Sequence, residues 1–162
     1  MALDFNKIYE NNLFEGNESV SGRGSDLKQT EILREKLVPL LKSMGVKKFL
    51  DLPCGDFNWM QHVDFDGIEY IGGDIVGGLV DKNNEKYGQP GRSFERINLM
   101  TSNFPSGIDA IFCRDCLVHL SFDEIKAVMN NIKRSDAKWL LTTTFPNHPV
   151  NKELTGIWRS LD

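Results

Sequence analysis

The chain has 162 residues, of which 40% are hydrophobic and 26% are charged, as in an ordinary single globular domain rather than a disordered or low-complexity chain. Its 19 basic and 23 acidic residues give a formal net charge of −4, which argues against a nucleic-acid partner. It contains no stretch of the ~20 apolar residues that a membrane helix needs. The N-terminal residues do not resemble a signal peptide, and the odd count of three cysteines predicts reduced thiols in a cytoplasmic compartment.

The first predicted elements are a lead-in segment and a helix. Residues 1–25 are polar and rich in Gly, Asn and Ser, and we interpret them as a flexible loop or lid. Asp26 is the expected N-cap of a helix whose leucines recur at helical spacing up to residue 44. Pro39 is expected to kink or restart this helix, and Gly45 to end it.

Five short apolar runs after residue 45 predict strands that alternate with helices. A modest helix is expected over residues 79–87, and the capping box of Ser121 and Glu124 predicts the start of another. Residues 146–162 show little periodicity and are interpreted as a loop. The expected strands are residues 46–52, 68–75, 93–99, 108–113 and 139–145.

This alternation predicts one α/β domain spanning residues 1–162, with a doubly wound, mostly parallel Rossmann-like sheet in its core, residues 26–145. The strand runs are apolar rather than alternating, as in strands covered on both faces. Ligands of such sheets bind outside the carboxyl ends of the strands. The residues that directly follow each strand are therefore the candidate site.

Two acids stand at the ends of the first two predicted strands. Asp74 follows Asp51 by 23 residues (74 − 51), which is close to the spacing of an acid that binds a nucleoside ribose. A carboxylate suits this role because it accepts hydrogen bonds from both vicinal hydroxyls. Gly55 in the intervening turn allows the backbone to approach a ligand.

Residues 46–145 resemble the class I S-adenosylmethionine-dependent methyltransferases, most strongly in FLDLPCGDFNWM (residues 49–60) and YIGGDIV (residues 70–76). The resemblance implies a Rossmann-like sheet, S-adenosyl-L-methionine as cofactor and S-adenosyl-L-homocysteine as product. It also implies that the cofactor lies across the ends of the first, second and fourth strands.

The resemblance assigns each strand end a part of the cofactor. The turn from Asp51 to Asp56 would hold the methionine part, Asp74 the ribose and Asn98 the adenine edge. The segment after the fourth strand would lie near the sulfonium. The complete set of expected cofactor-binding residues is Asp51, Pro53, Cys54, Gly55, Asp56, Asn58, Trp59, Asp74, Ile75, Asn98, Leu99, Cys113, Arg114 and Asp115.

The sequence departs from the family pattern in three places. The usual Gly-x-Gly-x-Gly is replaced by residues 53–57, Pro-Cys-Gly-Asp-Phe, and Asn98 stands where an Asp is commoner. Residues 146–162 are too few for the family's C-terminal antiparallel hairpin. We therefore expect either a trimmed form of the fold or a partner, such as a second copy of the chain, that covers the open sheet edge.

Asp115 and His119 are the candidate catalytic residues, since a general base is needed only if the acceptor must lose a proton early. The acidic chain favours a small-molecule acceptor, whose identity the sequence does not give. The alternative is a protein that binds S-adenosylmethionine for other chemistry or without turnover. A nicotinamide oxidoreductase would need Gly-x-Gly-x-x-Gly, and a phosphoacceptor domain an aspartate after the third strand; the chain has neither.

The Cys113-x-x-Cys116 pair has two further interpretations. It follows the fourth strand rather than opening the first helix, which favours semi-buried thiols over a redox pair. Together with His119 and His148 it provides four potential zinc ligands, but their spacing fits no standard zinc motif. We therefore predict no metal site.

Overall fold

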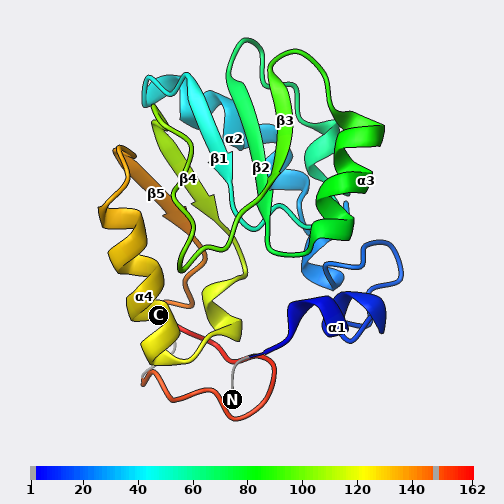
Figure 1. Cartoon of the computed structure of the whole chain (residues 1–162), viewed down its shortest axis with the longest axis vertical. Coiled ribbons are helices and arrows are strands. Elements are labelled where there is room, and N and C mark those ends of the chain that lie inside the picture. The colour runs from blue at the N-terminus through cyan, green and yellow to red at the C-terminus, as the bar shows by residue number, and fades with distance from the viewer. Residues whose placement is uncertain (1–2, 148–149) are drawn as a thin grey trace.

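The computed structural model describes residues 3–147 and 150–162. At its centre lies a five-stranded parallel sheet with the order β3-β2-β1-β4-β5 (Figure 1). This confirms the predicted doubly wound sheet, and the described residues contain no antiparallel strand. The five strands are β1 (Lys48–Asp51), β2 (Glu69–Asp74), β3 (Arg92–Arg96), β4 (Ala110–Cys113) and β5 (Trp139–Thr142).

Helices pack against both faces of the sheet. Leu37 of α2 (Glu31–Ser43) and Val80 of α3 (Gly77–Tyr87) belong to the same buried cluster on one face. Val128 of α4 (Phe122–Lys133) belongs to the cluster on the other face. Because side chains alternate along a strand, Phe49 of β1 joins the first cluster and Leu50 joins the second.

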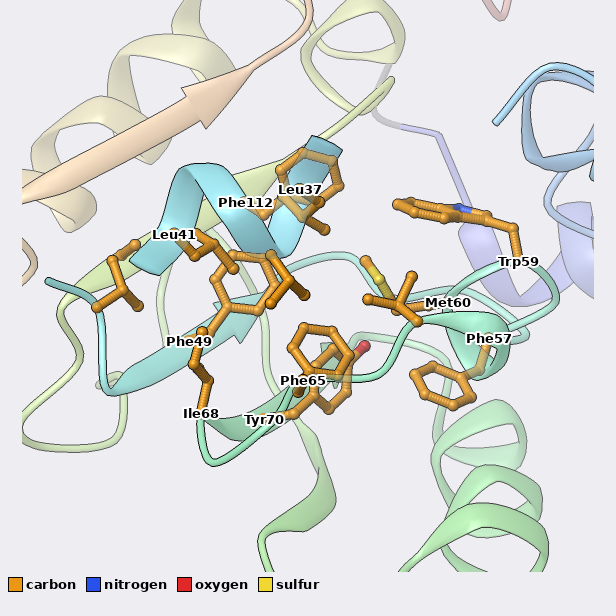
Figure 2. Close-up of a cluster of buried hydrophobic side chains, with 14 of the residues drawn as sticks. Leu37, Leu41, Phe49, Phe57, Trp59, Met60, Phe65, Ile68, Tyr70 and Phe112 are labelled. Carbon is orange, nitrogen blue, oxygen red and sulfur yellow. The ribbon is translucent and has the colours of Figure 1, made fainter. Parts of the chain in front are cut away.

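The first cluster is rich in aromatic rings, and it holds the turn that follows β1. Phe49 packs against Phe65, Tyr70 and Phe112, with ring centroids 5.8, 6.1 and 6.0 Å away. Figure 2 shows the α2 leucines on one side of Phe49, with Phe65 and Tyr70 on the other. Phe57 and Trp59 extend this cluster from the turn after β1. Packing within this aromatic cluster therefore fixes the carboxyl end of β1 and the turn that follows it.

The N-terminal half differs from the prediction in two respects. Residues 5–10 form a helix, α1 (Phe5–Glu10), whose N-cap Asp4 accepts from two backbone N–H groups, and Arg23–Ser25 form a 3₁₀ turn. The lead-in is therefore structured rather than a flexible loop. The prediction of Asp26 as the N-cap of α2 was also wrong, because residues 26–30 form turns and the helix begins at Glu31, after a fully buried Thr30.

The helix signals at Gly45 and Ser121 are confirmed, whereas Pro39 does not restart the helix as the sequence allowed. Helix α2 runs without interruption through Pro39 to Ser43, and Gly45 follows it with a positive φ of 72°. Ser121 and Glu124 form the expected capping box of α4 through both backbone N–H groups. Outside 148 and 149, the residues from 146 to 162 form neither helix nor strand. Among the described residues, none of the helices has the length and apolar character required to cross a membrane.

Candidate functional site

A cavity of about 620 Å³ lies at the carboxyl ends of the strands. The ends of β1, β2 and β4 and the residues after β3 form its inner wall. Its outer wall comes from both ends of the chain, namely residues 3–25 and residues 157–158. In Figure 1, α1 and the C-terminal segment lie at the end of the sheet toward which the arrows of β4 and β5 point. The cavity therefore lies at the position where doubly wound sheets usually bind their ligands.

The turn after β1 is bound directly to the end of β2. The backbone N–H of Gly55 donates to Asp74 Oδ2 over 3.0 Å, and that of Val76 donates to Oδ1 over 2.9 Å. Gly55 has a positive φ of 57°, which favours glycine. A Cβ on Gly55 would lie 2.2 Å from Ser21 Oγ. This single glycine therefore allows the turn to meet Asp74 on one side and the N-terminal segment on the other.

Asp51 and Asp74 are both buried and both line the cavity. Burial raises the pKa of Asp51 to about 7, although the Tyr70 hydroxyl donates to its Oδ2 over 2.6 Å. Burial also raises the pKa of Asp74, against the opposing effect of its backbone donors. A buried carboxylate is costly unless it meets a cation or donors. The inner wall therefore favours a ligand that brings a positive charge or several hydroxyl or N–H donors.

Most of the other expected binding residues also line the cavity. Pro53, Cys54 and Trp59 belong to the β1 turn, and Ile75 follows β2. Asn98 and Leu99 follow β3, where Asn98 Oδ1 accepts from the Met100 N–H over 2.9 Å. Arg114 and Asp115 follow β4. The structure thus brings the four strand ends together around one space.

Asp56, Asn58 and Cys113 lie outside the cavity lining. Asp56 accepts from the Ser19 hydroxyl over 2.8 Å and from the Val20 N–H over 3.0 Å. Asn58 donates to the Ser25 carbonyl over 3.1 Å. We call residues 13–25 the N-terminal strap. The hydrogen bonds of Asp56 and Asn58 hold this strap against the turn that follows β1.

The residues after β4 form a strained and paired segment. Asp115 has a positive φ of 51°, and its N–H donates to Thr143 Oγ1 over 2.9 Å. Asp115 forms a 3.0 Å ion pair with Arg114, which also donates to the Gly24 carbonyl over 2.8 Å. A non-glycine residue with positive φ persists where its surroundings hold it. Asp115 is therefore fixed at the cavity wall, beneath the N-terminal strap.

His119 connects three segments of the cavity wall. Its Nδ1 contacts the Ile157 carbonyl, and its ring packs against Phe14 of the strap at a centroid distance of 4.8 Å. Burial lowers the pKa of His119, which favours the neutral ring near pH 7. His119 therefore joins the segment after β4 to both ends of the chain.

The sequence predicts a loop or lid in residues 1–25, but it does not indicate which residues form the outer wall of the cavity. Leu13 and Phe14 of the strap, with Ile157 and Trp158 near the C-terminus, line the cavity. Their positions depend on long-range bonds, such as the one from the Arg159 N–H to the Val118 carbonyl over 3.1 Å. No local spacing in the sequence signals such contacts.

The cysteines and histidines do not form a metal site in the described part of the chain. His148, the fourth ligand of the zinc interpretation, lies outside the described residues. Cys113 is fully buried, Cys116 is partly buried, and both are free thiols. The contact with Cys113, together with burial, raises the pKa of Cys116 well above its usual value. A thiol of raised pKa is little ionised near neutral pH and therefore reacts slowly; because Cys113 is also fully buried, the pair has the character of packed thiols.

Neither protein-family models nor curated proteins gave a match to the sequence. Solved structures did. The methyltransferase domain of bacterial CtHen1-CN is similar at a TM-score of 0.62 and 17% identity, over 83% of this chain and 78% of that one. N-methyltransferase NodS from Bradyrhizobium japonicum WM9, in complex with S-adenosyl-L-homocysteine, is similar at a TM-score of 0.59 and 12% identity, over 76% of this chain.

A third similar structure is magnesium protoporphyrin IX methyltransferase, ChlM, from Synechocystis PCC 6803, with bound S-adenosyl-L-homocysteine. Its TM-score is 0.55 and its identity 20%, over 82% of this chain. The chain spans 65% of both ChlM and NodS, just under two-thirds of their length. The fold is therefore the Rossmann-like fold of class I S-adenosylmethionine-dependent methyltransferases.

Proposed function

We propose that this chain binds S-adenosyl-L-methionine in the cavity at the strand ends and transfers its methyl group to a small-molecule acceptor. The observation that carries the proposal is the pair of buried carboxylates, Asp51 and Asp74, at the ends of adjacent strands and facing one cavity. S-adenosylmethionine has a ribose diol, an ammonium group and a sulfonium. These are the donors and positive charges that the inner wall favours.

Each part of the inner wall has a distinct role in this proposal. Asp74 accepts from the ribose hydroxyls, while Gly55 and Val76 hold its two oxygens in place. Asp51 faces the ammonium group. Asn98, Leu99 and Ile75 surround the adenine. The C-terminal end of β4 leads to Arg114 and Asp115, which would lie on the methyl side.

The bound cofactor supplies an activated methyl group, so the protein mainly has to orient the reactants and exclude water. The strap performs the second task, because Gly24 and Ser21 lie directly over the β4 segment and the β1 turn. Asp115 would accept a proton from acceptors that must lose one early, and His119 is the second candidate. A small-molecule acceptor is favoured over a nucleic acid by the net charge of −4.

A second candidate function is S-adenosylmethionine binding without methyl transfer. It is favoured by the sheet edge at β5, which no further described strand covers. Calorimetry with S-adenosylmethionine, S-adenosylhomocysteine and NAD tests both functions. We expect the first two ligands to bind and NAD not to bind. Binding of NAD alone, or of none of the three, would exclude both functions.

Exchange of Asp115 for Asn tests its assigned role. Asp115→Asn keeps the shape of the side chain but weakens its ion pair with Arg114, which is partly exposed and contributes about 1 kcal/mol or less. If Asp115 is the base, the variant loses turnover by on the order of 100-fold while keeping S-adenosylhomocysteine affinity. The measurement is kcat and Kd side by side. A variant that melts, binds and turns over like the parent would rule out a catalytic role.

The N-terminal strap is expected to gain protection when the cofactor binds, because it forms the outer cover of the cavity. Hydrogen exchange of residues 19–25, with and without S-adenosylhomocysteine, measures this. Asp56→Ala removes the acceptor of the Ser19 and Val20 bonds, so we expect faster exchange there in both states. The matched control is Asp64→Ala, whose carboxylate bonds only the nearby Asp66 N–H in the described structure. Equal exchange with and without ligand would mean that the strap does not close over the cofactor.

A further inference from the structure

The outer half of the cavity is apolar and has no assigned ligand. Leu13, Ile157 and Trp158 line it, although 47%, 42% and 52% of their surfaces are exposed. Phe14 and Ile8 continue the same wall. The ring of Trp158 is held by an edge-to-face contact with Phe145 at a centroid distance of 5.7 Å. Exposed apolar side chains gathered around one cavity indicate a binding surface rather than scattered exposure.

Several charged and polar side chains in this half of the cavity already have partners. Arg114 and Asp115 pair with each other. Glu124 accepts from the N–H and hydroxyl of Ser121 in the capping box. The Tyr9 hydroxyl accepts from Lys82 Nζ over 2.7 Å.

Two further charges, Glu15 and Arg23, stand at the exposed rim, and they have opposite signs. Apart from these two exposed side chains, a charged ligand would find the charged and polar groups named above already paired. Removing an unpaired charge from water costs free energy. A flat apolar ring that packs on Trp158 and Leu13 would instead bury apolar surface, which is favourable.

We propose that the outer half of the cavity binds an uncharged aromatic small molecule, and that this molecule is the class of methyl acceptor. The second clause rests on the proposed function; the first does not. The site lies between the N-terminal strap and the C-terminal segment, and the contacts of His119 with Phe14 and with the Ile157 carbonyl hold both beside the segment after β4. An acceptor ring placed there lies beside the end of β4.

Binding of two matched probes tests the proposal. 2-Naphthol is uncharged at neutral pH, and 2-naphthoate has the same ring system with a negative charge. Each is titrated calorimetrically into the full chain, alone and with saturating S-adenosylhomocysteine. We expect 2-naphthol to bind at least about tenfold more tightly than 2-naphthoate. Equal binding, tighter binding of 2-naphthoate, or no binding of 2-naphthol would overturn the proposal.

Two tryptophan variants locate the binding. Trp158→Ala is expected to weaken 2-naphthol binding about tenfold and to leave S-adenosylhomocysteine affinity unchanged. Trp139→Ala is the control, because Trp139 lies on β5, is 46% exposed and does not line the cavity. If Trp158→Ala binds 2-naphthol like the parent, the site is misplaced. If 2-naphthol binds in a Trp158-dependent way but S-adenosylhomocysteine does not bind, the ligand class stands and the proposed function fails.

Discussion

Replacing Asp74 with alanine is expected to weaken S-adenosylhomocysteine binding by about 30- to 1000-fold, or on the order of 2–4 kcal/mol. The carboxylate is 5% exposed and lies at the end of β2. In the proposed function this carboxylate accepts from the ribose diol, so its loss removes charge-assisted hydrogen bonds, which are roughly twice as strong as neutral ones. Calorimetric Kd values for parent and variant give the result directly.

The design must separate ligand binding from folding, because Asp74 also holds the β1 turn. Alanine leaves the N–H groups of Gly55 and Val76 without their acceptor. Asp74→Asn keeps one acceptor oxygen and should still bind at least about tenfold more weakly than the parent. Asp81→Ala, which removes an exposed acid of α3, is the matched control. Parent-like affinity in a folded Asp74→Asn variant would remove the ribose assignment.

Local sequence signals were sufficient for the five strands and for the ends of β1, β2 and β4, but β3 and β5 end three residues earlier than predicted, at Arg96 and Thr142. The apolar runs before Asp51 and Asp74 are covered on both faces, so the acids that end them had to lie at one edge of a parallel sheet. The capping box at the start of α4 could also be recognised in the sequence, because Ser121 and Glu124 are only three residues apart. Signals of this kind depend only on neighbouring residues, and the structure confirms the elements they predicted.

A lid in residues 1–25 was expected, but the contacts that hold the cover of the cavity in place could not be predicted in this way. Asp56 lies in the acid-rich turn and was therefore expected to touch the cofactor, yet its partners Ser19 and Val20 stand 37 and 36 residues earlier in the chain. Trp158 lies in a segment without periodicity, which is placed by contacts to the β4 segment. Partners that far apart leave no spacing pattern, so only the folded chain reveals them.

The second large effect is expected in the pH dependence of stability, and it arises from Asp51. Its pKa is about 7 in the folded chain against 3.8 for an ordinary carboxyl. Between these values the folded state binds more protons than the unfolded state, so the free energy of unfolding falls as pH rises. Below about pH 4 both states are protonated and above about pH 7 both are ionised, so the dependence is confined to that window. The change is up to about 4 kcal/mol, at 1.36 kcal/mol per pKa unit.

Asp51→Asn isolates this contribution, because the amide oxygen still accepts from the Tyr70 hydroxyl and carries no charge. The groups facing Asp51 are Tyr70, Asp74 and Arg114, and they remain in the variant. Asp74 also has a raised pKa, so a smaller slope of the same sign should persist. Urea unfolding from about pH 4 to pH 8 should therefore show the variant gaining stability relative to the parent as pH rises. Parallel curves would mean that Asp51 titrates normally in the folded chain.

The same carboxyl should couple cofactor binding to proton release. An ammonium group beside Asp51 favours the ionised form and lowers its pKa, so binding near pH 6.5 should release a proton that the protein alone retains. Calorimetry in two buffers of different ionisation enthalpy measures this release, and S-adenosylhomocysteine affinity should rise with pH up to about 7. Asp51→Asn should bind more weakly and lose both effects, whereas Asp74→Asn should keep the part due to Asp51. Proton release that is unchanged in Asp51→Asn would place the ammonium group away from Asp51, and the methionine part of the cofactor would then lie elsewhere in the cavity.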